Sequence, residues 1–234
     1  MDLRDAWERN AADWVRWARK PGHDSYWRFH RDRFLDLVPA PGRLTLDVGC
    51  GEGRVTRDLQ ELGHRTVGLD ASETMIAAAR EEDPSGEYLV ANAAELPFPD
   101  GHADLAVAFM SLMDVDDMPA VVRELARIVE QGGKLALAVV HPINSAHEVE
   151  REHPEDRLVL TEDYFDRRRY TDVIERDDVK MTFESRHFTF EDYFDALLGA
   201  GFQIEAVREI SDPQHPRWSR YPLFLHALAS RDKV

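Results

Sequence analysis

Two acids and three glycines mark the stretch of this sequence best suited to chemistry. Asp47 is followed by glycine at every second position, at Gly49, Gly51 and Gly53. Glycines spaced in this way let the backbone turn sharply, and they let a ligand approach main-chain N–H groups without meeting a Cβ atom. Asp70 lies about 20 residues beyond this loop, where nucleotide-binding α/β folds place a carboxylate that accepts hydrogen bonds from ribose hydroxyls. The pattern therefore predicts a nucleoside-containing ligand.

The flanking residues predict the elements that hold the loop. Residues 44–48 form an apolar strand-like run, and Val55, Leu59 and Leu62 share one face of a helix that begins just after the loop. Residues 64–70 form a second short strand that ends in Asp70. A helix N-terminus next to the loop adds the positive end of its dipole, and the alternation of strands and helices demands a parallel sheet.

Elements are predicted along the rest of the chain as well. Residues 2–20 form a polar helix with Trp7, Trp14 and Trp17 on about one face, which either docks on the domain or covers a small-molecule site. Ser72 and Thr189 are predicted helix caps. The other expected segments are helices at 26–38 and 118–129, strands at 88–91, 104–110, 134–140, 202–210 and 222–229, and a strand pair at 157–160 and 180–185.

The glycine spacing separates two classes of ligand. A dinucleotide loop reads G-x-G-x-x-G and leaves room for a pyrophosphate, whereas an acid such as Asp47 beside the loop would repel a pyrophosphate and suits an amino group. Residues 46–53, Leu-Asp-Val-Gly-Cys-Gly-Glu-Gly, resemble the first motif of the class I S-adenosylmethionine-dependent methyltransferases. The resemblance runs from about residue 43 to residue 141 and resumes near Phe188.

This resemblance implies a fold and a domain plan. The fold is α/β, a doubly wound Rossmann-like sheet of about seven strands, mostly parallel with an antiparallel edge strand, together with a helical N-terminal cap and an inserted lid. Residues 1–234 would form a single domain, with the cap at 1–42, the cofactor-binding core at 43–140, the lid at 141–187 and the last helix and strands at 188–234. The implied cofactor is S-adenosyl-L-methionine, with S-adenosyl-L-homocysteine as the product.

The matched positions also suggest roles for individual residues. Asp47 and the loop 49–53 would hold the methionine moiety, and Asp70 the ribose. Asn92 stands where the family often has an acid that meets the adenine amino group, and an amide can both accept and donate there. The full set of cofactor-binding candidates is Asp47, Gly49, Cys50, Gly51, Gly53, Asp70, Ala71, Met75, Asn92, Ala93, Met110 and Ser111.

Methyl transfer needs a base only if the acceptor must lose a proton. His141, at the end of the fifth strand, and His187, just before a capped helix, are the catalytic candidates, and a purely structural role for each is the alternative. Tyr26, Tyr164 and Tyr170 are candidates for lining the acceptor site. No metal is expected, because His147 and His153 are not at ligand spacing.

Composition narrows the possible partners. A net charge of −16 over 234 residues disfavours nucleic acid and anionic membranes, so a small-molecule acceptor is expected, with the protein a monomer or homodimer. The single cysteine, Cys50, excludes an intrachain disulfide, and no apolar leader is visible, so a cytoplasmic location is expected. Three alternatives stay open: a non-catalytic S-adenosylmethionine-binding partner protein, an NAD-dependent oxidoreductase, and a methyltransferase acting on RNA or protein.

Overall fold

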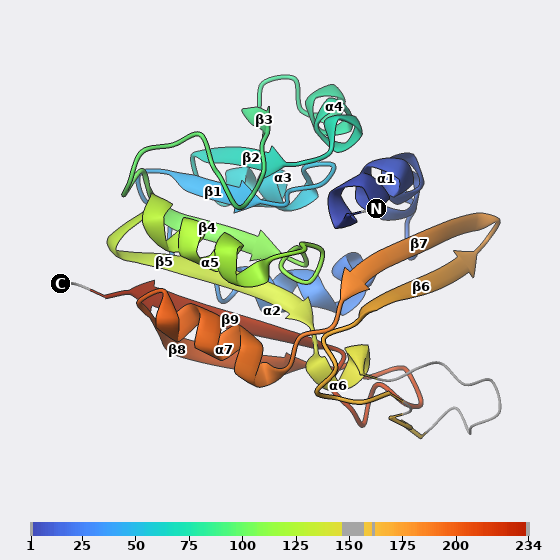
Figure 1. Ribbon diagram of the computed structural model, residues 1–234. Coiled ribbons are helices and arrows are strands. Elements are labelled where there is room, and N and C mark those ends of the chain that lie inside the picture. Colours follow the sequence, from blue (N-terminus) through green and yellow to red (C-terminus); the bar gives the residue numbers. More distant parts are fainter. Residues whose placement is uncertain (1, 147–156, 161, 233–234) are drawn as a thin grey trace.

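A seven-stranded sheet forms the centre of the molecule. The computed structural model describes residues 2–146, 157–160 and 162–232 (Figure 1). The sheet has the order β3-β2-β1-β4-β5-β9-β8. The first five strands in this order run parallel, and β9 runs antiparallel to both of its neighbours. The strands are β1 Thr45–Val48, β2 Thr66–Asp70, β3 Tyr88–Val90, β4 Ala103–Phe109, β5 Val129–Val140, β8 Phe202–Ile210 and β9 Phe224–Arg231. The predicted α/β fold is confirmed.

Helices cover both faces of this sheet. Figure 1 shows α5 and α7 side by side over β4, β5 and the β9–β8 edge, with α2 and α3 behind the strands. The helices are α1 Leu3–Arg19, the π-helix η1 Tyr26–His30, α2 Arg31–Leu35, α3 Arg54–Glu61, α4 Glu73–Glu82, α5 Met118–Ile128, α6 Pro142–Ser145 and α7 Phe190–Gly199. The predicted helix at 26–38 is thus a π-helical turn that continues into a short α-helix.

Alternate residues of the central strands bury opposite faces. Leu135 and Leu137 of β5 belong to the core cluster that includes α5 and α7 side chains, whereas Ala136 between them belongs to a second cluster with Phe34 and Leu59. Successive side chains of a strand point to opposite faces, so a strand buried on both sides reads as a nearly continuous apolar run. This is why the fourth and fifth strands could be located from sequence.

The predicted helix caps are also present. Ser72 accepts a hydrogen bond from the Met75 N–H at 3.1 Å. Thr189 and Asp192 form a reciprocal capping box at the start of α7, which satisfies two backbone donors that the helix itself leaves unpaired. Ser72 caps α4 directly after Asp70, so it fixes the backbone at the carboxyl end of β2.

A two-stranded hairpin corrects one prediction. Residues 157–160 do not form a strand; β7 Val179–Arg186 pairs instead with β6 Arg169–Arg176. The turn between them is Asp177-Asp178, with φ angles of 45° and 63°. Tight hairpins favour a two-residue turn with positive φ, which Asp tolerates better than most residues. This dipeptide was the signal in the sequence for the true register.

Helix α1 lies along this hairpin, as Figure 1 shows. The rings of Trp7, Trp14 and Trp17 lie edge-on around Phe183 of β7, with centroid distances of 6.0–6.4 Å. The Trp7 indole N–H donates to the Glu184 carbonyl at 2.9 Å. All three tryptophans also line the main cavity of the molecule. The docking and covering roles considered for the α1 tryptophans are therefore combined in one face of the helix.

Candidate functional site

One large cavity opens at the carboxyl ends of the parallel strands. Its volume is about 930 Å³, at the upper end of the range for a site that encloses a drug-sized ligand. The glycine loop, Asp70 and Asn92 line one end, and Tyr170 of the hairpin and Trp218 of the β8–β9 loop line another. Ligands of open α/β sheets bind at this edge. Of the twelve cofactor-binding candidates, all except Gly53 line the cavity.

Close packing of the glycine loop explains why glycines are required. Gly49 has a φ angle of +77°, and a Cβ atom on it would lie 2.3 Å from the Cβ of Ser111. The Ser111 hydroxyl donates to the Val48 carbonyl at 2.8 Å, joining the ends of β4 and β1. Gly53 has a φ angle of +83° and packs against Tyr88 and Ala79. Gly53 therefore lies on the side of the loop that packs against Tyr88 and Ala79, whereas Gly49 lines the cavity.

Asp70 ties the glycine loop to the end of β2. Its Oδ2 accepts from the Gly51 N–H at 2.8 Å, and its Oδ1 accepts from the Ser72 N–H at 2.9 Å. Burial raises the pKa of Asp70, and the N–H groups of Ser72 and Gly51 oppose this rise. Each carboxylate oxygen has a second lone pair, so the same carboxylate has acceptor capacity for two adjacent hydroxyls of a ribose.

Asp47 has an unsatisfied oxygen. Its side chain is 1% exposed, and its Oδ2 accepts from the Thr56 hydroxyl at 2.6 Å. Its Oδ1 has no hydrogen-bond partner among the described residues, although buried polar atoms in proteins are almost always paired. A ligand ammonium next to the loop would supply the missing partner, so the site fits the amino group of S-adenosylmethionine.

The charge on Asp47 predicts a pH-dependent stability. Burial raises its pKa to about 7 in the folded protein, against about 3.9 in an unfolded chain. The folded state therefore binds a proton more readily, and stability attributable to Asp47 falls as the pH rises from about 4 to about 7, by up to about 4 kcal/mol. Denaturant unfolding of the ligand-free protein across this range should show a smaller fall for Asp47→Asn than for the wild type. Equal slopes in the two proteins would contradict the assignment.

The part of the cavity lined by residues from Asp47 to Asn92 is called the cofactor half. Asn92, Met75 and Cys50 line it. Asn92 turns its carboxamide oxygen back to accept from the Ala94 N–H at 3.1 Å, which leaves its amide nitrogen as a donor. Met75 is 3% exposed and lines the cavity wall. Burial raises the pKa of the Cys50 thiol well above its usual range, so Cys50 is a packing residue rather than a nucleophile.

Two predicted site residues, Met110 and Tyr170, lie close to an acid, Asp114, that was not among the candidates. Met110 has a φ angle of +55°, an uncommon conformation for a side chain of this size and one that accumulates at functional sites. Asp114 follows four residues later, and its Oδ1 accepts from the Ser185 hydroxyl at 2.6 Å. Burial raises the pKa of Asp114 well above its usual range. Tyr170 pairs with Ser185 across the hairpin and lines the same cavity.

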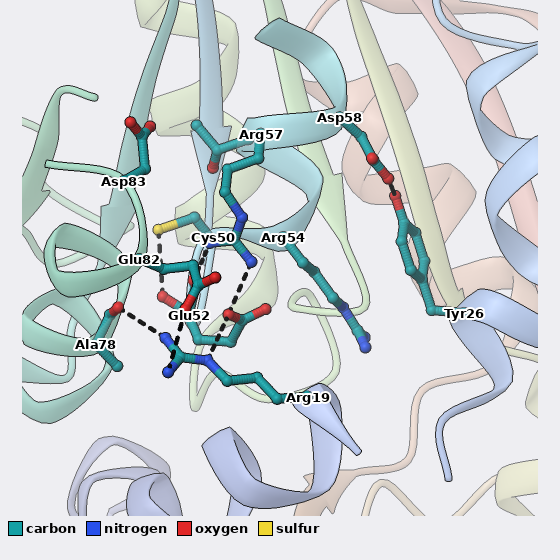
Figure 2. Close-up of polar contacts among 12 residues, drawn as sticks. Arg19, Tyr26, Cys50, Glu52, Arg54, Arg57, Asp58, Ala78, Glu82 and Asp83 are labelled. Atoms are coloured by element: carbon teal, nitrogen blue, oxygen red, sulfur yellow. Dashed lines mark hydrogen bonds and ion pairs between the residues drawn. The ribbon is translucent and has the colours of Figure 1, made fainter. Parts of the chain in front are cut away.

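Charged and polar contacts hold helix α1 against the glycine loop and the start of α4. Glu8 bonds the Ser72 hydroxyl and, at 2.6 Å, the Thr74 hydroxyl. Figure 2 shows Arg19 and Arg57 converging on Glu52, with N–O distances of 3.3 and 2.9 Å. These contacts connect α1 to the glycine loop and to α4. They join residues up to 66 positions apart, so no local sequence pattern predicts them.

Arg54, the first residue of α3, points away from this charged cluster, toward the side of Tyr26 (Figure 2). Its guanidinium lies 4.9 Å from the Trp14 ring centroid and 4.7 Å from the Tyr26 centroid, and 3.0 Å from Asp24. Arg54 is buried and lines the cavity. Its positive charge therefore lies next to the glycine loop and is paired with Asp24.

The two catalytic candidates have structural partners and do not line the cavity. His141 accepts from the Ile143 N–H at 3.2 Å and donates to Glu209 at 3.1 Å. His187 accepts from the Ser145 hydroxyl at 2.7 Å, and its other ring nitrogen meets the Tyr164 carbonyl at 2.8 Å. Burial is the largest influence on both histidines and lowers each pKa. The geometry supports the structural alternative for both residues.

The three tyrosine candidates differ in whether they reach the cavity. Tyr170 lines the cavity, but Tyr26 and Tyr164 do not. The Tyr164 hydroxyl accepts from the Phe190 N–H at 3.2 Å. Tyr26 is fully buried, and its hydroxyl donates to Asp58 (Figure 2), which also binds Arg31 through two N–H groups at 2.8 and 2.9 Å. Tyr26 therefore holds η1 on α3.

Replacing Tyr26 with phenylalanine tests this structural role. Removing one buried hydrogen bond to a carboxylate should lower the free energy of unfolding by about 1.5–3 kcal/mol. The dissociation constant of S-adenosylmethionine should not change, because the ring and its contact with Arg54 remain. Chemical denaturation and calorimetric titration measure the two quantities. Weaker ligand binding at unchanged stability would restore Tyr26 as a site residue.

In the described ranges, no group of three or more His, Cys, Asp or Glu side chains is arranged to hold a metal ion. His147 and His153 lie outside the described residues. No helix in the described part of the chain has the length and apolarity needed to cross a bilayer.

Comparison with known proteins agrees with this geometry. Residues 46–137 match the methyltransferase domain family. The demethylmenaquinone methyltransferase of Corynebacterium urealyticum is 38% identical over 117 residues, 50% of this chain and 49% of the relative. The malonyl-[acyl-carrier protein] O-methyltransferase of Pectobacterium atrosepticum is 34% identical over 110 residues, 47% of this chain and 44% of the relative. The chain thus spans about half the length of these curated relatives.

A solved structure extends the similarity to most of the chain. The S-adenosylmethionine dependent methyltransferase of Mesorhizobium loti superposes with a TM-score of 0.70 at 26% identity, covering 89% of this chain and 98% of that protein. The sheet order, the glycine loop and the matched domain define a class I S-adenosylmethionine-dependent methyltransferase domain. The cofactor of this class is S-adenosylmethionine.

Proposed function

We propose that the protein transfers a methyl group from S-adenosylmethionine to a small molecule. The observation that carries this proposal is the continuity of the cavity. Residues suited to the cofactor, from Asp47 to Asn92, share it with Asp114, Tyr170 and Trp218, which lie on other elements. A protein that only bound the cofactor would need no further space in the cavity beside the cofactor. Helix α1 contributes Trp7 and Trp14 to the lining, and the β6–β7 hairpin contributes Tyr170 and Phe183. These aromatic side chains would exclude water from the site.

Within this proposal, each residue has a role in binding or orientation. Asp47 binds the ammonium group, Asp70 the ribose, and Asn92 the adenine. Met110 and Ser111 lie beside the sulfonium. The bound cofactor supplies an already activated methyl carbon, so the chain mainly has to align the acceptor and keep out water.

The charge of the cavity favours an uncharged or cationic acceptor. Ten Asp or Glu residues and four arginines contribute to its lining within the described residues. Three of the arginines are engaged: Arg28 binds Asp212 at 2.8 Å, Arg54 binds Asp24, and Arg176 donates to the His23 carbonyl at 2.8 Å. An acceptor carboxylate would have to displace these contacts in a field of like charge.

The relatives differ in the substrates that their names state. A malonyl group carries a carboxylate, which this cavity disfavours. Demethylmenaquinone is an uncharged ring compound and suits the aromatic side chains that line the cavity, such as Trp14, Phe183 and Trp218. We therefore favour an uncharged or cationic ring compound with an O, N or C acceptor atom.

Transfer of label from methyl-tritiated S-adenosylmethionine tests the proposal. The acceptor panel comprises 2-naphthol, phenethylamine and benzoate as representatives of neutral, cationic and anionic ring compounds. Label should reach one of the first two and not benzoate. Preferred labelling of benzoate would contradict the acceptor class. Binding of the cofactor without any transfer would favour the alternative of a non-catalytic partner protein. An NAD-dependent activity is disfavoured because Asp47 would face the pyrophosphate.

A further inference from the structure

Two buried histidines on distant segments form a pair next to this cavity. His30 ends the π-helix η1, and His226 lies on β9, 196 residues later. His30 Nδ1 and His226 Nε2 are 2.9 Å apart, so one of these nitrogens donates to the other. Their exposed fractions are 1% and 0%. His30 lines the cavity and His226 does not.

The outer nitrogens of the pair are unsatisfied. His30 Nε2 and His226 Nδ1 have no hydrogen-bond partner within the described part of the chain. An unpaired buried polar atom costs about 1–3 kcal/mol. Because His226 occupies the Nδ1 side of the His30 ring, the Nε2 side is the one that can meet a molecule in the cavity.

Aromatic neighbours hold the His30 ring in place. Its centroid lies 3.9 Å from that of Phe224, 5.1 Å from that of Phe109 and 5.9 Å from that of Phe29. Phe109 is the last residue of β4 and directly precedes Met110 and Ser111. The ring therefore stands at the end of the strand where the proposed function places the sulfonium. Single π-helical turns such as η1 recur at functional sites.

We infer that His30 is the general base that takes the proton from an acceptor hydroxyl or amine during methyl transfer, positioned for this by His226. The inference rests on the proposed function and narrows it to O–H and N–H acceptors. The acceptor atom forms its bond to the methyl carbon, the electron pair of the broken C–S bond stays on sulfur, and the acceptor proton goes to His30 Nε2. The proton leaves to solvent when the product departs.

The charges around the pair keep it neutral in the free protein. Burial, His226 and Arg54 lower the pKa of His30, which leaves the imidazole unprotonated and also weakens it as a base. Burial lowers the pKa of His226 to about 3, with Arg33 and Arg208 acting in the same direction, while the Arg33 backbone opposes them. Transfer moves one positive charge from the sulfonium to the imidazole, so the net charge of the cavity does not change.

Two tautomers of the neutral pair are possible, and only one serves as a base. If His30 donates from Nδ1 to His226, its Nε2 carries a lone pair toward the cavity. The inference therefore requires the proton of His30 to lie on Nδ1 and His226 Nε2 to accept the hydrogen bond between the two rings.

The first arm of the test needs no acceptor. Long-range nitrogen–proton NMR spectra of histidine-labelled protein, with S-adenosylhomocysteine bound, report which ring nitrogen carries the proton. The His30 signals are assigned by their loss in His30→Asn. An unprotonated Nε2 at pH 7 is expected, and a protonated Nε2 would overturn the inference. Titration calorimetry on the same sample separates this from the proposed function, because a wild type that binds no S-adenosylhomocysteine contradicts the function and leaves the tautomer readable.

The second arm compares two phenols. His30→Asn keeps a polar atom close to the Nδ1 position and removes the base. With 2-naphthol its kcat should fall by about 10²–10⁴-fold, whereas 4-nitrophenol, which is largely ionised at pH 8, should show a far smaller loss. His226→Leu should lower kcat and shift its pH profile, and His226→Gln, which retains an acceptor, should recover part of the rate. Equal losses on both phenols, or selective rescue of Asp114→Asn by the ionised phenol, would overturn the inference.

Discussion

Replacing Asp70 with alanine is expected to weaken S-adenosylmethionine binding by about 1.5–3 kcal/mol for each lost hydrogen bond to the ribose. One such bond corresponds to roughly a ten- to hundredfold higher dissociation constant. Asp70 also braces the loop through the N–H groups of Gly51 and Ser72, so part of the loss comes from a loosened loop. Titration calorimetry of the variant measures the change in affinity.

The matched control is Asp70→Asn, which keeps the shape and one oxygen acceptor. It should lose less affinity than the alanine variant, because one of the two braces at Gly51 and Ser72 survives. Its stability should stay closer to that of the wild type, because burial disfavours the charged Asp70 carboxylate and asparagine carries no charge. Wild-type affinity in Asp70→Ala would exclude Asp70 from the ribose site.

Gly49→Ala is expected to have the largest effect on stability. A left-handed backbone costs about 1–2 kcal/mol for a residue with a side chain, and the new Cβ would lie 2.3 Å from that of Ser111. Such overpacking typically costs about 1–3 kcal/mol more. The variant should therefore lose about 2–5 kcal/mol of folding free energy, or about 2–4 °C in Tm for each kcal/mol. Cofactor binding should weaken too, because the loop would have to move away from β4.

Gly201→Ala provides the matched control for the backbone term. Gly201 has a φ angle of +85°, but a Cβ there meets nothing within 4 Å. Its substitution should cost only about 1–2 kcal/mol and leave the affinity for S-adenosylmethionine unchanged. Thermal unfolding of both variants isolates the cost of the contact with Ser111. Equal losses in Gly49→Ala and Gly201→Ala would contradict this account of the loop.

The cofactor half of the site could be predicted because its signals are local. Asp47, Gly49 and Asp70 lie within 25 residues, on a strand, a turn and the next strand. Periodicity then locates the strands, and the parallel connections bring their carboxyl ends together at one edge. The caps at Ser72 and Thr189 are likewise readable, since each depends on residues three positions apart.

The rest of the site depends on contacts that no local pattern encodes. His141 and His187 stand near the expected edge of the sheet, but their ring nitrogens are engaged by Glu209 and Ser145, among other groups. The ring of His30 contacts His226, which lies 196 residues away in the sequence. Asp114 was visible at the end of β4, yet its partner Ser185 comes from a hairpin whose register depends on a two-residue turn.

Thermal unfolding with different ligands tests the central claim most directly. The purified protein is heated alone, with S-adenosylmethionine or S-adenosylhomocysteine at a hundredfold its dissociation constant, or with NAD at the same concentration as S-adenosylmethionine. A ligand that binds the folded state should add about 2.7 kcal/mol, which raises Tm by roughly 5–10 °C at this chain length. We expect this shift with the two sulfur nucleosides and none with NAD. A shift with NAD alone would contradict the assignment of the cavity to S-adenosylmethionine.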